Sequence, residues 1–216
     1  MRDFFKLPHG GRKHLINRWN TLMEGLGIGP DAHFQTLDDL LTRYTEPHRE
    51  YHNLAHVNTL LELISPDPKT PVSDLELAAW FHDAIYDTTQ GRNEEESALL
   101  AEQRLAALGI DPALRARVSQ LILATKTHQA TDPRMRLFIE ADLSILGAPP
   151  KTYRAYSKAI RKEYAWVPAE VFTANRARIL RSFLAREVIF QTEPFRGLEG
   201  RARANMEEEV EGLLVK

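Results

Sequence analysis

Apolar residues recur at helical spacing along nearly the whole of this 216-residue chain, and no segment shows a strand alternation supported by hairpin turns. This periodicity predicts an all-α fold of about ten helices in one domain that spans residues 1–216. The expected helices cover residues 12–25, 33–43, 52–64, 74–86, 94–108, 112–127, 133–146, 151–164, 168–186 and 199–214. A helical bundle with a detachable hairpin after Pro194 is the alternative organisation.

Proline and glycine mark several of the connections between these helices. Three prolines in residues 65–71 remove backbone donors, so this segment is expected to be a loop. Gly109 and the Gly-Ala-Pro-Pro run at 147–150 each end a helix. Asn93, followed three residues later by Glu96, resembles a capping box and predicts a helix start.

Charge and composition exclude several classes of function. Lys and Arg number 28 and Asp and Glu number 30, so the net charge of −2 argues against a dedicated nucleic-acid binder. The absence of cysteine excludes disulfides, thiolate metal sites and a cysteine nucleophile, so histidine and carboxylate groups must hold any metal. No apolar run approaches the roughly 18 residues of a membrane span. The N-terminus also lacks the apolar core of a signal peptide, so a cytoplasmic protein is expected.

Carboxylates and histidines interrupt the apolar faces of three expected helices. Asp142 lies on the same stripe of helix 133–146 as Phe138 and Ile145. His82 and Asp83 are embedded in the apolar face of helix 74–86 in the same way. A buried carboxylate without compensation is costly, so each of these groups needs a cation or a set of hydrogen bonds.

Helix 52–64 adds two histidines, His52 and His56, which are four residues apart and therefore on one helical face. Any one such residue is more often a structural group that has found its partners in the core. Together, the histidines and aspartates of the three helices form a nitrogen and oxygen donor set that first-row divalent metals accept.

The chain resembles the HD superfamily of metal-dependent phosphohydrolases in the order of these residues on successive helices: His56, then the His82-Asp83 pair, then Asp142. Residues 51–56 (YHNLAH) and 141–144 (ADLS) are similar to segments of the cyclic-nucleotide phosphodiesterases, which share the HD fold. Over most of the chain, the resemblance is to a bacterial group of HD-type phosphohydrolases. The C-terminal segments that share this resemblance are residues 161–164, 181–184 and 202–205.

The resemblance implies an all-α fold and a divalent metal bound by His56, His82, Asp83 and Asp142. It also implies hydrolysis of a phosphate ester or anhydride, in a nucleotide or another small phosphorylated molecule, by a metal-activated water. By the phosphodiesterase parallel, His52 protonates the leaving oxygen. The phosphodiesterases have further ligands that complete a two-metal site, and this sequence does not match all of them, so the number of bound ions could be one or two. The resemblance also does not distinguish among Mn, Fe, Zn, Co, Ni and Mg.

Two acidic residues are further candidates for the site. Asp87 follows Asp83 by four residues, so it orients a metal-bound water if the helix continues, and otherwise it opens the turn at 88–91. Glu94 follows that turn and is expected to reach the site from there, whereas Glu96 is expected to be a capping residue.

Three cationic residues are candidates for binding the substrate phosphate. Lys126 and His128 close helix 112–127, where the helix dipole alone favours cations, and His128 is also a candidate ligand for a second metal. Arg176 lies on an apolar stripe and needs a bidentate partner, either the phosphate or a carboxylate such as Glu163 or Glu187.

Two other functions compete with the phosphohydrolase. A few HD-fold proteins use two iron ions for oxygen chemistry, and such a di-iron oxygenase would need extra ligands, for which His128 and Glu94 are available. A non-catalytic module that binds metal or nucleotide is the other rival, although His52 beside the ligands speaks against it. Neither the substrate nor the oligomeric state follows from the sequence.

Overall fold

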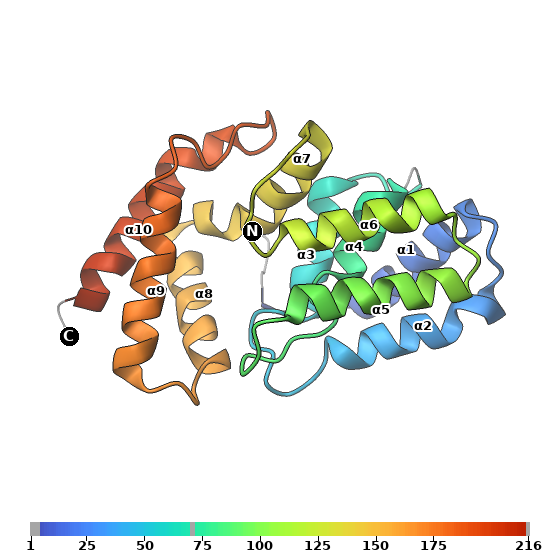
Figure 1. Ribbon diagram of the computed structural model, residues 1–216, viewed down its shortest axis with the longest axis horizontal. Coiled ribbons are helices and arrows are strands. Elements are labelled where there is room, and N and C mark those ends of the chain that lie inside the picture. Colours follow the sequence, from blue (N-terminus) through green and yellow to red (C-terminus); the bar gives the residue numbers. More distant parts are fainter. Residues whose placement is uncertain (1–4, 70–71, 215–216) are drawn as a thin grey trace. The chain divides into compact units, whose positions relative to one another are not determined.

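The computed structural model describes residues 5–69 and 72–214, and every regular element within these ranges is a helix (Figure 1). The described chain contains ten α-helices and two short 3-10 helices, which confirms the predicted all-α fold of about ten helices. Residues 65–69 form no helix, as expected, and residues 70 and 71 of that predicted loop lie outside the described residues. No helix in the described ranges has the length and apolar character needed to cross a membrane.

The chain divides into two compact units, residues 1–139 and 140–216. The helices that begin in the first unit are α1 (Gly11–Gly25), α2 (Pro30–Arg43), α3 (Leu54–Ile64), α4 (Ser73–Phe81), α5 (Asn93–Ala107), α6 (Pro112–Ala124) and α7 (Pro133–Asp142). The second unit contains the end of α7, followed by the 3-10 helix η1 (Leu143–Gly147), α8 (Pro150–Glu163), α9 (Ala169–Leu184), the 3-10 helix η2 (Arg196–Leu198) and α10 (Glu199–Leu214).

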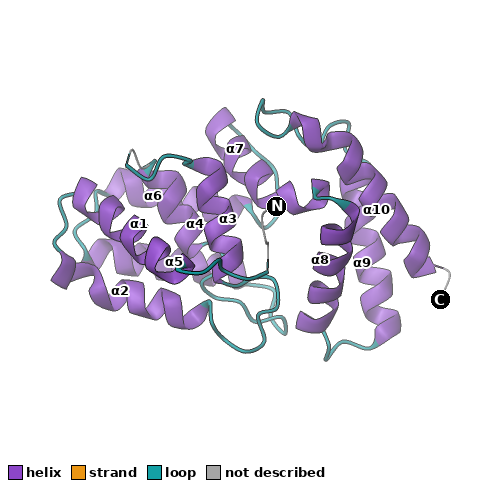
Figure 2. Cartoon of the chain, turned by 180° about the vertical axis from the view of Figure 1, so that it is seen from behind, coloured by secondary structure: helices purple, strands orange, loops and turns teal. Residues whose placement is uncertain are grey.

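Helices α3 and α4 form the centre of the first unit. They pack against each other, and α4 also packs against α5 and α6, which lie side by side (Figures 1 and 2). An aromatic contact joins α1 and α4, where the rings of Trp19 and Trp80 meet edge to face with centroids 5.4 Å apart. The indole nitrogen of Trp19 donates to Nδ1 of His33 at 3.1 Å. Because both central helices are almost entirely buried, any polar group on them must find a partner inside the protein.

Several helix ends differ from the sequence prediction. Helix α3 begins at Leu54 rather than at residue 52, because the Asn53 side chain accepts a hydrogen bond from the Ala55 backbone at 2.8 Å and so caps the helix. Helix α6 ends at Ala124, three residues early, and α7 changes to 3-10 geometry after Asp142.

The second unit is built around α10, which packs against α8, α9 and η1. The Asn205 side chain donates to the carbonyl oxygens of Leu146 and Ala148 at 2.8 and 2.9 Å, and so holds the chain that leaves η1. A Cβ atom on Gly147 would lie 2.5 Å from the Cβ of Leu198, so only glycine permits η1 and η2 to approach this closely.

Candidate metal centre

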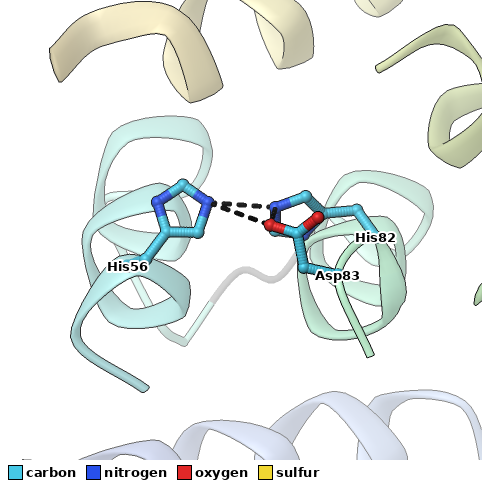
Figure 3. Close-up of side chains that lie close together, drawn as sticks. All are labelled: His56, His82 and Asp83. Carbon is cyan, nitrogen blue, oxygen red and sulfur yellow. Dashed lines mark hydrogen bonds and ion pairs between the residues drawn. The ribbon is translucent and has the colours of Figure 1, made fainter. Parts of the chain in front are cut away.

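Three ionisable side chains of the first unit converge on one point (Figure 3): His56 in the first turn of α3, and His82 and Asp83 directly after α4. The Nε2 atoms of the two histidines are 3.0 Å apart. An Asp83 carboxylate oxygen lies 3.0 Å from Nε2 of His82 and 3.8 Å from Nε2 of His56. Both histidines are buried and Asp83 is partly buried, so this cluster lies within the packed helices rather than on the open surface.

The donor atoms of this cluster fit a metal ion. Two nitrogen ligands that are each about 2.1 Å from an ion, at right angles to one another, lie about 3.0 Å apart. The Nδ1 of His82 donates to the Ala79 carbonyl oxygen at 3.0 Å, and this hydrogen bond orients Nε2 toward His56 and Asp83. Two imidazoles and a carboxylate are a donor set that first-row divalent metals accept.

The Asp83 carboxylate is the negative group of this cluster. Burial acts to raise its pKa, but His82, with smaller contributions from His52 and His56, outweighs burial and holds the pKa of Asp83 well below its usual range. Asp83 is therefore ionised at neutral pH and available as a ligand.

The segment that carries His82 and Asp83 leaves the helix where the sequence predicts that the helix continues. Helix α4 ends at Phe81 rather than at residue 86, so that part of the prediction is wrong. Backbone groups of this segment bond to side chains instead of to other backbone groups of a continued helix. These side chains bond to backbone groups of residues 83–87 and come from Tyr44, His48, Arg49, Asn93 and Ser97. These partners lie far from residues 83–87 in sequence or follow them in a later helix, so helical periodicity did not reveal them.

His52 lies beside the cluster but not on α3. It precedes the cap of that helix, so the predicted helical face shared by His52 and His56 is wrong. The two rings are nevertheless neighbours, with centroids 5.8 Å apart, and the His52 ring packs at 4.4 Å against that of Tyr86. His52 is therefore close to the three converging donors without being one of them.

Asp87 has the local role of opening a turn. Its carboxylate accepts hydrogen bonds from the backbone and hydroxyl of Thr89 and from the Gln90 side chain, and the bonds from Thr89 lower its pKa. The Asn93 side chain bonds to the backbone N–H and carbonyl of Asp87, so it does not cap α5, and the expected capping box is absent. Glu94 lies in the first turn of α5, outside the cluster of three donors.

Lys126 and His128 follow α6 rather than closing it. The Lys126 ammonium pairs with Glu95 and donates to the Gly91 carbonyl at 3.0 Å, and its hydrogen bond lowers the pKa of Glu95. His128 adopts a left-handed backbone conformation, with φ at 50°, and its N–H bonds to the Ala124 carbonyl. The structure thus gives Lys126 a carboxylate partner on α5.

Arg176 is buried, as its position on an apolar stripe predicts, but its partner is Glu209 rather than Glu163 or Glu187. The guanidinium contacts both carboxylate oxygens of Glu209, at 2.9 and 3.2 Å. The Tyr153 hydroxyl also donates to Glu209, as does Ser157 at 2.8 Å. This arrangement satisfies the bidentate requirement of Arg176 within the protein.

Asp142, the fourth ligand implied by the family resemblance, is the last residue of α7 and belongs to the second unit. It lies near Tyr156 of α8. Burial raises the pKa of the Tyr156 hydroxyl, Arg176 opposes this effect, and the negative charges of Glu209 and Asp142 raise the pKa further.

Arg49 is the residue near the cluster that sequence reasoning missed. It is 6% exposed and donates to the carbonyl oxygens of both His52 and Asp83. Its position two residues before YHNLAH is the only signal in the sequence, and charge patterning alone gives it no special status.

Comparison with known proteins adds no family to this description. No family model matches the chain, and neither curated protein sequences nor solved structures give a match.

Proposed function

We propose that this protein is a metal-dependent phosphohydrolase whose divalent metal is held by His56, His82 and Asp83. The observation that carries the proposal is the 3.0 Å separation of the two imidazole Nε2 atoms beside an ionised carboxylate. The two imidazoles and the carboxylate contact one another through these donor atoms. Together they make a nitrogen and oxygen donor set that a first-row divalent metal accepts.

A divalent metal at this position supplies Lewis acidity and lowers the pKa of a water molecule bound to it. The chain's own residues have separate tasks. Asp83 stays ionised to contribute negative charge, and the hydrogen bond to Ala79 orients the Nε2 of His82 toward the other two donors. His52, which is adjacent to the donors, holds the proton that goes to the leaving oxygen. Asp142 is the proposed fourth ligand, on the family resemblance alone.

The proposed substrate is a phosphate ester or anhydride in a nucleotide or another small phosphorylated molecule. This substrate class rests on the HD resemblance. Among the predicted phosphate-binding residues, Arg176 and Lys126 already have carboxylate partners. His128, in the segment after α6, stays a predicted phosphate-binding residue on the sequence alone.

A second function has one observation in its favour. Two histidines and one carboxylate are also the donor set of the non-haem iron oxygenases. An iron content of about one or two atoms per chain, together with oxygen consumption and no release of phosphate, would favour that function.

The test is a screen of phosphate release from nucleotides and of p-nitrophenol release from bis-p-nitrophenyl phosphate, with Mn²⁺, Co²⁺, Zn²⁺ or Mg²⁺ added. His56→Ala is expected to lose both metal and turnover. His52→Ala is expected to retain metal and lose about a hundredfold in kcat. The surface substitution His14→Ala is the control and should change neither. Bound metal without turnover of any substrate would contradict the enzyme and favour a binding module, and metal lost only from His52→Ala would reverse the two roles.

A further inference from the structure

We propose that Arg49 is a positioning residue, which fixes the metal ligand Asp83 and the proton donor His52 relative to one another through a single guanidinium group. This inference rests on the proposed function, because it assigns Arg49 a role in the same centre. Arg49 does not contact the donor atoms themselves. It acts through the backbone of the residues that carry them.

The contacts of Arg49 join two segments that are far apart in the sequence. Its Nη1 donates to the His52 carbonyl oxygen at 3.1 Å and to the Asp83 carbonyl oxygen at 2.7 Å. Its Nη2 donates to the Ala84 carbonyl oxygen at 3.1 Å, and its Nε donates to the Glu46 carboxylate at 2.9 Å. One side chain therefore supplies partners to three carbonyl groups on both sides of the cluster.

Aromatic rings hold the guanidinium in place. Its central carbon lies 5.1 Å from the ring centroid of Tyr44 and 5.3 Å from that of Tyr86. The hydroxyl of Tyr44 also accepts a hydrogen bond from the Asp83 N–H at 3.3 Å. The Asp83 peptide groups are consequently fixed on both sides, by Tyr44 at the N–H and by Arg49 at the carbonyl.

Only arginine meets these requirements. The four acceptors lie around a planar fork with five N–H donors, whereas a lysine ammonium has three donors on one atom. Because metal ligands must be held within about 0.5 Å of their working positions, loosening the Asp83 backbone is expected to weaken metal binding. Arg49→Lys keeps the charge and removes the fork.

A second buried arginine provides a matched control at the opposite end of the same two helices. Arg18 is 3% exposed, donates to the Leu61 carbonyl near the end of α3, and pairs with Glu76 near the start of α4. Arg18 thus links α3 and α4 at one end, whereas Arg49 links the segments that flank the other ends of these helices. The contacts of Arg18 include neither the three candidate metal-binding residues nor the residues next to them. Arg18→Lys therefore measures how the loss of a buried guanidinium group changes stability, without a direct effect on the candidate metal centre.

The experiment is a Co²⁺ titration of the full chain, followed by visible absorption, with melting temperatures recorded for each variant. Arg49→Lys is expected to weaken Co²⁺ binding by about tenfold or more and to change the absorption bands. Arg18→Lys is expected to lower the melting temperature at least as much and to keep the Co²⁺ affinity within about twofold of wild type. Glu46→Ala, at a partly exposed position, removes the anchor at Nε together with a longer contact to His48, and should weaken binding about two- to fivefold.

Two results would overturn the proposal. One is an Arg49→Lys variant that binds Co²⁺ within twofold of wild type. The other is an Arg18→Lys variant that weakens Co²⁺ binding equally at the same loss of stability. If Arg49→Lys does not fold, Glu46→Ala decides, and an unchanged affinity in that variant overturns the proposal. A wild-type chain that binds no Co²⁺ would instead refute the proposed function, and the role of Arg49 with it.

Discussion

Each unit of this protein contains a buried polar cluster, and the two clusters differ in the chemical groups that they bring together. In the second unit, Glu209 accepts from Arg176, Tyr153 and Ser157, so donors meet acceptors and a positive charge meets a negative one. In the first unit, His56, His82 and Asp83 bring two imidazole nitrogens and a carboxylate oxygen together at one point, which is a donor set that a divalent metal accepts.

The difference shows how a charged residue on an apolar helical face should be interpreted. Such a residue reveals that a partner is needed, but it does not reveal whether the partner is another side chain or a ligand. Arg176 and Asp83 give equivalent signals in the sequence. The chemical character of their neighbours separates an internal ion pair from a candidate metal site.

The largest expected effect is the loss of stability in Glu209→Ala. This substitution leaves the buried Arg176 guanidinium without its counter-charge, which typically costs about 3–5 kcal/mol. Glu208→Ala, at the adjacent exposed position that pairs with Arg154, is the matched control and should cost less than about 1 kcal/mol. Urea unfolding measures both. If Glu209→Ala lost no more stability than Glu208→Ala, the assignment of Glu209 as the counter-charge of the buried Arg176 would be contradicted.

Asp142→Ala tests the fourth metal ligand that the family resemblance implies. As the fourth ligand, Asp142 should make metal binding at least about a hundredfold tighter, which corresponds to about 2.7 kcal/mol. Isothermal titration with Zn²⁺ measures the affinity, and Asp142→Asn separates loss of charge from loss of volume. An affinity equal to that of wild type would remove Asp142 from the ligand set.

Asp132→Asn tests the ion pair between Asp132 and Arg117 in the first unit. Asp132 accepts from both Nη atoms of Arg117 at 2.8 Å and from the backbone of Met135, and these bonds lower its pKa to about 2. Because this pKa is lower than that of the unfolded chain, about 3.9, the carboxylate stabilises the fold fully above pH 4 and loses this effect as the pH falls through 2. The free energy of unfolding of wild type should exceed that of the variant by about 1 kcal/mol at pH 7, a figure that allows for solvent screening, and this difference should vanish below pH 2. A difference that does not depend on pH would contradict the assignment.

Lys126→Ala is expected to have the smallest effect. The ammonium pairs with Glu95 at a partly exposed position, so its loss should change the free energy of unfolding by less than about 1 kcal/mol. Turnover of whichever phosphate ester is hydrolysed should stay within about twofold of wild type. A drop in kcat/KM of tenfold or more would restore Lys126 as a phosphate-binding residue.

Periodicity was sufficient to predict the helices because their apolar faces are local features of the sequence. It failed where long-range partners decide the outcome. Helix α4 stops at Phe81 because side chains such as Arg49, which is 34 residues from Asp83 in the sequence, bond to the backbone beyond it. The position of His52 outside α3 depends on the cap at Asn53, a local signal that the helical pattern obscured.

The same distinction explains the predicted site. His56, His82 and Asp83 were identified because each interrupts an apolar stripe, and the structure brings these three together. Arg176 interrupts a stripe in the same way, but its partner Glu209 is 33 residues away and could not be chosen over Glu163 or Glu187 from the sequence. Arg49 interrupts no predicted helix, so nothing in the pattern pointed to it.

The central claim is that His56, His82 and Asp83 hold a divalent metal, and thermal unfolding of wild type and His82→Ala with and without Zn²⁺ tests it most directly. A ligand that binds only the folded state at a concentration of 100 times its Kd stabilises that state by about 2.7 kcal/mol. Zn²⁺ is therefore predicted to raise the melting temperature of wild type by several degrees and to leave that of His82→Ala unchanged. Equal shifts in the two proteins, or no shift in wild type at millimolar Zn²⁺, would contradict the claim.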